Sequence, residues 1–193
     1  MRKNEIDLMF LGLLMQGPAH GYELKKRIAV SFGTQYPNPS DSVLYHRLAQ
    51  FEKEGLVTGK VEQQQGMPNK KVYSLTEAGF RRVRELVATP IQLSGNLGDA
   101  YTDELTIHIV FFKLITKEER RKVIEPFYTL ALSRYDDTKQ KIDKYQTGLD
   151  KYSLTLLRYG VQLLKLYIEM FKEIMEIDEE PLDMDVLFKT LHK

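Results

Sequence analysis

The sequence predicts a mostly α-helical protein with one small β-hairpin wing, divided into an N-terminal region at residues 1–90 and a helical region at residues 100–193. Three observations support this prediction. Apolar residues recur at helical spacing through most of the chain. Two stretches of alternating residues flank a turn that contains Gly66 and Pro68. Heptad patterns fill much of the second half.

Composition narrows the class of protein. The chain has 193 residues, of which 42% are hydrophobic and 28% are charged, as in ordinary globular proteins. The absence of cysteine excludes disulfides and thiolate metal sites and favours a reducing compartment. The apolar run Leu8–Met15 is too short to span a bilayer, and no signal-peptide cleavage site follows it. We therefore expect a cytoplasmic protein that does not associate with membranes.

Charge is distributed unevenly along the chain. Up to Pro90 there are 13 Lys and Arg against 9 Asp and Glu, whereas the remainder has 15 against 18. A basic N-terminal region joined to an acidic C-terminal region suits a DNA-binding head on a body that does not bind DNA.

The first two predicted helices are short and amphipathic. Apolar residues from Ile6 to Leu14 predict a helix over about residues 4–15, which Gly17 and Pro18 end. A second helix starts near His20 and Gly21. Its apolar face carries Leu24, Ile28 and Phe32, and its other face carries Lys25, Lys26 and Arg27.

The third predicted helix, over about residues 40–54, has two distinct faces. Ser40 is a favourable N-cap, and Gly55 follows the last turn. One face is apolar and belongs to the core: Leu44, Leu48 and Phe51. The other has small and hydrogen-bonding side chains that fit a DNA groove: Ser42, Tyr45, His46, Ala49 and Lys53.

A two-stranded hairpin follows this helix at once, which is the element order of a winged helix-turn-helix. Its polar side chains can reach phosphates: Lys60, Gln63, Gln65, Asn69, Lys70 and Lys71. Thr76 then caps a fourth helix. The predicted DNA contacts are Tyr22, Lys25, Lys26, Ser40, Ser42, Tyr45, His46, Ala49, Lys53, Lys60, Gln65, Asn69, Lys70 and Lys71. A simply solvated surface is the alternative for these residues, above all for the lysines of the second helix.

Five sequence elements, in this order and spacing, resemble a PadR-type transcriptional regulator. They are Leu11-Gly12-Leu13-Leu14, Gly17-Pro18-x-His20-Gly21-Tyr22-Glu23-Leu24, Ser42-Val43-Leu44-Tyr45, Leu48-x-x-Phe51-Glu52-x-Glu54-Gly55-Leu56-Val57 and Tyr73-x-Leu75-Thr76-x-x-Gly79. The resemblance covers about the first ninety residues. It implies a homodimeric bacterial repressor with a winged-helix head and a long helical C-terminal dimerisation region.

The apolar pattern in the second half of the chain predicts helices that pack against one another. One helix is marked by Leu105, Ile109, Phe112 and Ile115 and ends near Thr116, where a capping box starts the next. That helix carries a heptad seam from Ile124 to Leu149, with Pro126 near its start. A short docking turn is expected at residues 182–188.

After Asp150 comes a helix with two apolar stripes, a pattern that requires neighbours on two sides. We expect one neighbour to be the preceding antiparallel helix and the other to be the same region of a second chain, so that the helices pair across a dimer. The predicted dimerisation residues are Leu154, Leu157, Val161, Leu164, Ile168 and Phe171. The second stripe contains Leu156, Leu163, Tyr167, Met170 and Ile174.

These patterns favour a dimeric, sequence-specific DNA-binding transcriptional repressor. We expect its partners to be double-stranded DNA with a palindromic or pseudo-palindromic operator, a second copy of the chain and, as an open point, a small aromatic effector that relieves repression. No catalytic or dinucleotide motif occurs, and the four histidines lack metal-ligand spacing, so we expect neither an enzyme nor a metal or cofactor. The alternative is a helical adaptor whose winged helix binds protein instead of DNA.

Overall fold

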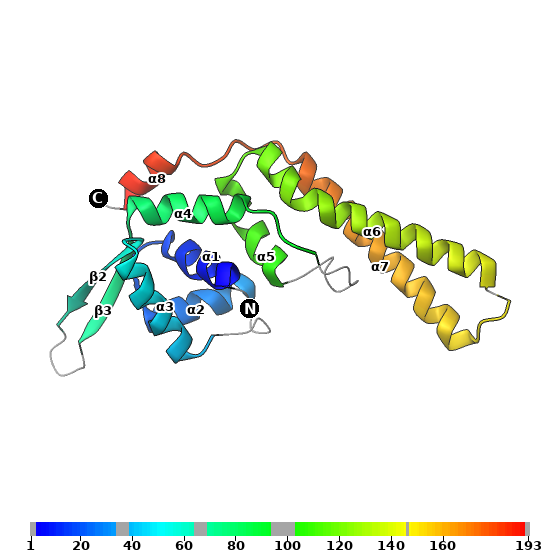
Figure 1. The fold of residues 1–193 in the computed structure, drawn as a ribbon, viewed down its shortest axis with the longest axis horizontal. Coiled ribbons are helices and arrows are strands. Elements are labelled where there is room, and N and C mark those ends of the chain that lie inside the picture. Colours follow the sequence, from blue (N-terminus) through cyan, green and yellow to red (C-terminus); the bar gives the residue numbers. More distant parts are fainter. Residues whose placement is uncertain (1–2, 34–38, 64–68, 94–102, 146, 192–193) are drawn as a thin grey trace. The chain divides into compact units, whose positions relative to one another are not determined.

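The computed structural model of this chain describes residues 3–33, 39–63, 69–93, 103–145 and 147–191 (Figure 1). The fold is mostly helical with one small sheet, as predicted. In chain order its elements are α1 (Lys3–Leu14), β1 (Ala19–His20), α2 (Gly21–Phe32), α3 (Asp41–Lys53), β2 (Val57–Glu62), β3 (Lys70–Leu75), α4 (Glu77–Ala88), α5 (Asp103–Val110), a 3-10 turn η2 (Phe112–Leu114), α6 (Lys117–Tyr145), α7 (Lys151–Glu176) and α8 (Met184–Leu191).

The chain forms two compact units. The head unit comprises residues 1–89, 103–115 and 181–193, and the helix-pair unit comprises residues 90–102 and 116–180. The head unit thus takes α5, η2 and α8 from the region that the sequence assigns to residues 100–193. Division into independently folding domains at 1–90 and 100–193 stays a prediction.

Helix α1 is the centre of the head unit. Nine of its twelve residues are buried, including Leu8, Phe10 and Leu11. At Gly12 a Cβ atom would lie only 2.4 Å from the Phe111 ring, so glycine permits the segment after α5 to pack directly on the α1 backbone.

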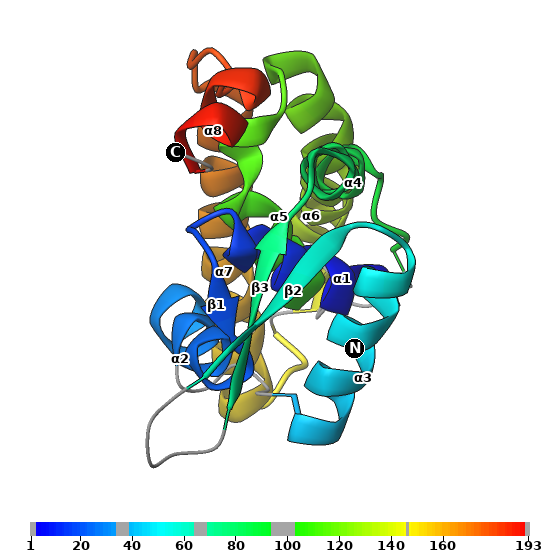
Figure 2. The same ribbon diagram turned by 90° about the vertical axis from the view of Figure 1, so that its left-hand side faces the viewer.

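The wing has one more strand than the predicted hairpin. Strands β2 and β3 pair antiparallel from Val57 opposite Leu75 to Glu62 opposite Lys70. The short strand β1 adds to the other side of β3, so the order is β1-β3-β2 (Figure 2). The strand lies between α1 and α2, and its two residues are too few to show an alternating pattern, so periodicity does not predict a strand there.

Local capping sets where the helices flanking the wing end and begin. Helix α3 ends in a Schellman motif, in which the left-handed Gly55 (φ 70°) and the Leu56 amide donate back to carbonyls of the last turn. The Thr76 hydroxyl accepts from the Gly79 amide and donates to the Gly55 carbonyl. A Cβ atom at Gly79 would lie 2.1 Å from the Leu56 carbonyl oxygen, so only glycine fits there.

The prediction of one helix through Ile115 is wrong in its C-terminal part. Helix α5 ends at Val110, and Phe111 leaves the helical conformation with φ −106° and ψ 11° before η2. The break turns the Phe111 side chain into the core, so tertiary packing overrides a continuous helical pattern. Nearby, the buried His108 donates its Nδ1 proton to the Val87 carbonyl at 3.0 Å. Burial lowers the pKa of His108 from 6.5 to about 4.

The predicted C-terminal docking turn is the eight-residue helix α8. Asp183 caps it by accepting from the Asp185 and Val186 amides. Its Phe188 ring packs edge-on against Phe80 of α4, with centroids 5.3 Å apart.

Helices α6 and α7 run side by side in the helix-pair unit (Figure 1). Asp150 begins α7 by accepting from the Tyr152 and Ser153 amides. The Phe127 and Phe171 rings pack between the helices, and Arg120 of α6 donates to the Ile177 carbonyl beyond the end of α7. Within the described part of the chain, no helix combines the length and the apolar character needed to cross a membrane.

Candidate DNA-binding surface

A buried ion pair fixes how α3 lies on the head unit. The Arg47 guanidinium donates to the Asp7 carboxylate of α1, and both side chains are at least nine-tenths buried. Burial raises the pKa of Asp7 above its ordinary value, while the charge of Arg47 and its hydrogen bond lower it. Arg47 also lies over the Phe51 ring, 4.7 Å from its centroid. Because an unpaired buried charge is costly, this contact sets the rotation of α3 about its axis.

The opposite face of α3 is open to solvent, as its sequence predicts. Ser40 caps the helix by accepting from the Val43 amide, at 3.3 Å. The five residues predicted to enter a groove are all exposed: Ser42, Tyr45, His46, Ala49 and Lys53. The last three also line a shallow hollow of about 390 Å³ together with Gln50.

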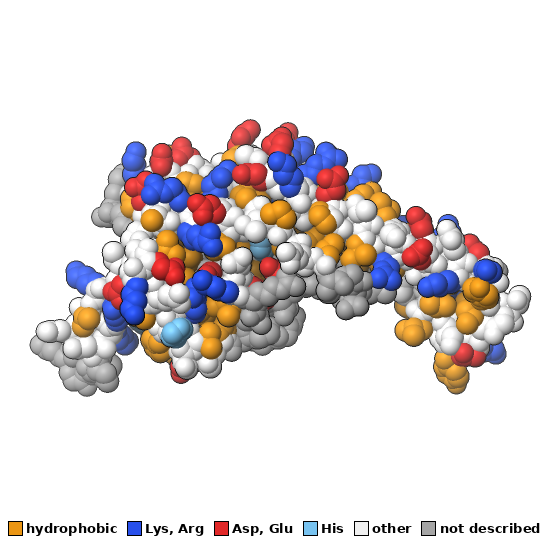
Figure 3. Space-filling view, viewed as in Figure 1, with side chains coloured by type: hydrophobic (Ala, Val, Ile, Leu, Met, Phe, Trp, Pro, Cys, Tyr) orange, Lys and Arg blue, Asp and Glu red, His pale blue; other side chains and the backbone are white. Residues whose placement is uncertain are grey.

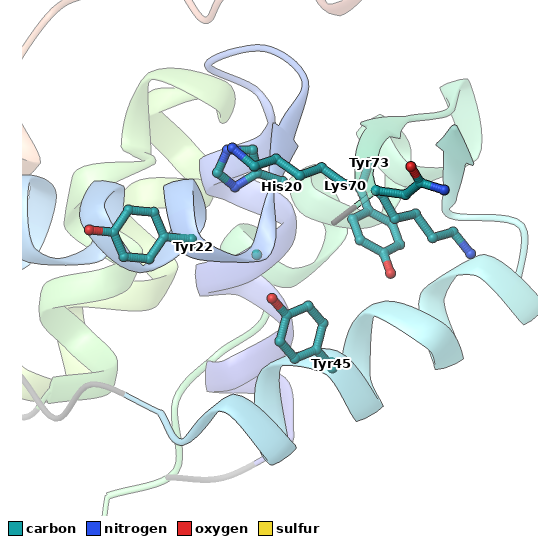
Figure 4. A pocket seen from close by; sticks show the side chains of 8 residues that line it. His20, Tyr22, Tyr45, Lys70 and Tyr73 are labelled. Atoms are coloured by element: carbon teal, nitrogen blue, oxygen red, sulfur yellow. The ribbon is translucent and has the colours of Figure 1, made fainter. Parts of the chain in front are cut away.

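A second hollow, of about 400 Å³, lies where α2, α3 and the wing meet. It is lined by His20, Gly21, Tyr22, Tyr45, Asn69, Lys70, Lys71 and Tyr73. Figure 4 shows the rings of Tyr22, Tyr45 and Tyr73 around this space, one each from α2, α3 and β3. Phenol hydroxyls, an amide and ammonium groups thus face solvent together, a set that can contact both bases and phosphates.

The position of Tyr45 depends on a glycine in α2. A Cβ atom at Gly21 would lie 2.8 Å from three atoms of the Tyr45 side chain, so the ring lies directly against the start of α2. His20, the N-cap of α2, accepts from the Glu23 amide at 3.2 Å and leaves Gly21 at the first helical position. Tyr45 is nevertheless half exposed, so it is supported on one side and free on the other.

The basic side chains of α2 differ in whether they already have an acidic or carbonyl partner within the protein. Tyr22 is 63% exposed, and the Lys26 ammonium lies 4.8 Å from its ring centroid. Lys25 instead pairs with Asp41 at the start of α3. Arg27 donates to the Gly17 carbonyl at 2.7 Å and to Glu23, so it stabilises the turn before α2.

The two neighbouring lysines of the wing also differ. Lys71 forms an ion pair with Glu52 of α3 at 2.7 Å, whereas Lys70 forms none with the described residues. Lys60 and Asn69 are exposed. Gln65, also a predicted DNA contact, lies outside the described residues.

The residues of this surface that the sequence patterns do not predict include Gly21, Glu52 and Tyr73. Tyr73 is nearly buried beneath the hollow, and burial raises the pKa of its hydroxyl. All three belong to the sequence elements that resemble PadR regulators, and that was the available signal. Their contacts join segments distant in sequence, which helix and strand periodicity do not reveal.

The helix-pair unit exposes a different kind of surface. Of the predicted dimerisation residues, Leu164 and Phe171 are buried within this chain, while Leu154, Leu157, Val161 and Ile168 are half-buried. The strongly exposed apolar side chains of α7 lie on another face, at Tyr152, Leu156, Tyr159, Leu163 and Leu166. In Figure 3, hydrophobic side chains protrude at the end of the α6–α7 pair, while Lys and Arg side chains lie over α3 and the wing strands as well as over α4 and α6.

Several solved structures align with most of the chain. Bacillus subtilis PadR in complex with operator DNA matches 88% of this chain and 95% of its own, with 18% identity and a TM-score of 0.43. A Streptococcus mutans protein matches 90% and 98%, with 18% identity and a TM-score of 0.40. A PadR-like transcriptional regulator of Bacillus cereus matches 91% and 96%, with 22% identity and a TM-score of 0.37.

No curated protein matches the chain in sequence. The sequence model of the Transcriptional regulator PadR-like family, however, matches residues 10–85, which run from α1 through the wing into α4. This stretch contains α3, the hollow beside it and the described wing strands. The region that carries the candidate surface is therefore similar to the PadR-like family of transcriptional regulators.

Proposed function

We propose that this protein is a dimeric, sequence-specific DNA-binding transcriptional regulator that acts as a repressor in the cytoplasm. One observation carries the proposal. The polar face of α3 is uncovered over its whole length, while the Asp7–Arg47 pair holds the other face in the core. Such a helix, with a wing beside it, is suited to lie in a major groove.

The N-terminal half of α3 reads bases in this proposal. Ser42 and Tyr45 lie in its first turns, the part of a recognition helix that penetrates the groove. His46 and Ala49 follow on the same exposed face, where an imidazole can hydrogen-bond a base edge and a methyl group can contact thymine. Lys53 at the far end is placed to contact a phosphate.

The wing and α2 anchor the protein on the backbone. Lys60, Asn69 and Lys70 lie along the described wing strands and beside them, and Tyr22 and Lys26 lie on the exposed side of α2. Contacts of this kind neutralise phosphates and release counterions, so they contribute affinity without choosing a sequence.

Dimerisation through α7 supplies the symmetry that a palindromic operator needs. Tyr152, Leu156, Tyr159, Leu163 and Leu166 are separated by four, three, four and three residues, which is the seam of a helical coiled coil. This seam shares Leu156 and Leu163 with the second predicted stripe and adds Tyr152, Tyr159 and Leu166. It is the face that a second copy of the chain can cover. A twofold axis would set the two half-sites one or two helical turns apart.

Relief by a small aromatic effector is part of the proposal. Tyr152 and Tyr159 lie along the proposed dimer seam, so a flat apolar compound can stack on their rings near the dimer axis. Thermal-shift measurements with planar aromatic compounds test this point, and a flat response throughout would remove it.

The central experiment measures binding to DNA from upstream of the protein's own gene, because such repressors commonly regulate their own transcription. Fluorescence anisotropy at several salt concentrations should give tight, steeply salt-dependent binding to one duplex and weaker binding to a scrambled one. Footprinting then locates the operator. Absence of salt-dependent duplex binding would favour an adaptor that binds protein.

A further inference from the structure

The Glu52–Lys71 ion pair joins the last turn of α3 to strand β3 of the wing. Glu52 Oε2 accepts from Lys71 Nζ at 2.7 Å, across 19 positions of sequence. Each side chain is somewhat more than one-third exposed. This is the described ion pair that connects the recognition helix directly to the wing.

The ion pair lies in a space that β2 leaves open. Gly59 faces Tyr73 across the β2–β3 ladder, and Lys71 lies two residues before Tyr73 on the same strand. A Cβ atom at Gly59 would lie 2.2 Å from Lys71 Cε and 2.7 Å from Glu52 Oε1. A side chain at position 59 would therefore displace the ends of the Lys71 and Glu52 side chains from their present positions.

Lys71 is held from a second direction as well. Its ammonium lies 5.5 Å from the centroid of the Tyr73 ring, a favourable cation–π arrangement. The hydrogen bond that Lys71 donates to Glu52 raises the pKa of the lysine, so it stays charged in the pair. Lys70 next to it has no ion pair with the described residues.

We propose that Glu52 and Lys71 form a latch that positions the wing against α3, and that Lys71 is a positioning residue while Lys70 is the phosphate ligand. The DNA part of this inference rests on the proposed function, whereas the latch itself does not. Lys71 was predicted from sequence as a backbone contact, and the latch gives it a different role. Gly59 is the third component, because its missing side chain makes room for the pair.

The latch is tested in the free, full-length protein by amide hydrogen exchange over β2 and β3. Glu52→Gln and Lys71→Met each remove one charge, and Gly59→Ala keeps both charges but fills the space between them. Each should accelerate exchange in the wing about twofold to fivefold, as expected for loss of a partly exposed ion pair. The double variant Glu52→Gln/Lys71→Met should exchange little faster than either single variant, because both substitutions break the same contact. Lys70→Met is the matched control and should leave wing exchange unchanged.

Salt titrations with duplex DNA test whether Lys70 contacts a phosphate while Lys71 does not. Lys70→Met should reduce the slope of log affinity against log salt by about 0.9 per chain, as expected for one lost phosphate contact. Lys71→Met should leave the slope unchanged, because Glu52 already neutralises that charge.

Two results would overturn the inference. Unchanged wing exchange in both Glu52→Gln and Gly59→Ala would show that no latch exists, whatever the DNA results. A slope reduced as much by Lys71→Met as by Lys70→Met would make Lys71 a phosphate ligand. If the wild-type protein bound no duplex, the proposed function would fail, and the exchange measurements would still decide the latch.

Discussion

Helices α3 and α7 each bury one face and expose the other, but their exposed faces differ in chemistry. That of α3 carries hydroxyl, imidazole, methyl and ammonium groups, whereas that of α7 carries leucine and tyrosine at coiled-coil spacing. The first kind of surface can satisfy base edges and phosphates, and the second can be removed from water only by another apolar surface. Exposure indicates where a partner binds, and side-chain chemistry indicates which partner.

The largest effect is expected on the buried face of α7. Leu164→Glu places a carboxylate at a site that is 3% exposed against α6, and it should lower the free energy of unfolding of the helix-pair unit by about 4 kcal/mol. Chemical denaturation followed by circular dichroism measures the loss. A change below about 1 kcal/mol would show that this face of α7 is not buried in a hydrophobic core.

Mild acid should destabilise the head unit more than the helix-pair unit. The folded pKa of His108 is about 4 and its ordinary value is 6.5, so the folded state disfavours the protonated imidazole. The stability that this histidine contributes is complete above pH 6.5 and is lost as the pH falls towards 4, by about 3 kcal/mol in all.

His108 lies in the head unit, and residues 90–102 and 116–180 contain no histidine. Between pH 6.5 and 4.5, hydrogen exchange should therefore accelerate in α4 and α5 more than in α6 and α7. His108→Gln removes the titrating group and is the control, since it should flatten this pH dependence. Equal acceleration in both units of the wild type would contradict the assignment to His108.

Leu163→Glu tests the exposed face of the same helix, one residue before Leu164. Leu163 is 49% exposed, so the substitution should leave the fold intact. In a dimer that buries this seam, the new charge should weaken association by about 2 kcal/mol per chain. Sedimentation at micromolar concentration should show a dimer for the wild type and a monomer for the variant. Gln162→Glu adds the same charge outside the seam and should remain dimeric; a monomeric wild type would remove the dimer proposal.

Sequence patterns predicted most of this fold because most of its signals are local. Ser40, Thr76 and Asp150 begin helices as N-caps, and the faces of α3 follow from simple helical spacing. The sequence could not decide which stripe of α7 faces α6, because both stripes are apolar and the choice depends on α6. The roles of Gly21, Glu52 and Gly59 were likewise hidden, since each depends on a contact with a distant segment.

The smallest of these effects is expected at Tyr45, where the loss concerns one contact on an exposed face. Tyr45→Ala should weaken operator binding by about 1–3 kcal/mol per chain and leave binding to scrambled DNA nearly unchanged, because a base contact carries sequence information and a phosphate contact does not. Tyr45→Phe keeps the ring and removes the hydroxyl, so it separates stacking from hydrogen bonding.

Gly21→Ala tests the Tyr45 side chain indirectly, from the α2 side on which its ring rests. Its Cβ atom would lie 2.8 Å from the Tyr45 ring and hydroxyl, so the tyrosine must move while α2 stays helical. Reduced preference for the operator in both Gly21→Ala and Tyr45→Ala, with an unchanged salt slope, would assign base reading to this residue and phosphate contact to the wing. A reduced salt slope with unchanged preference would assign Tyr45 to the backbone instead. The exposed face of α3 would then anchor the protein on DNA, and base reading would have to come from His46 and Ala49 further along the helix.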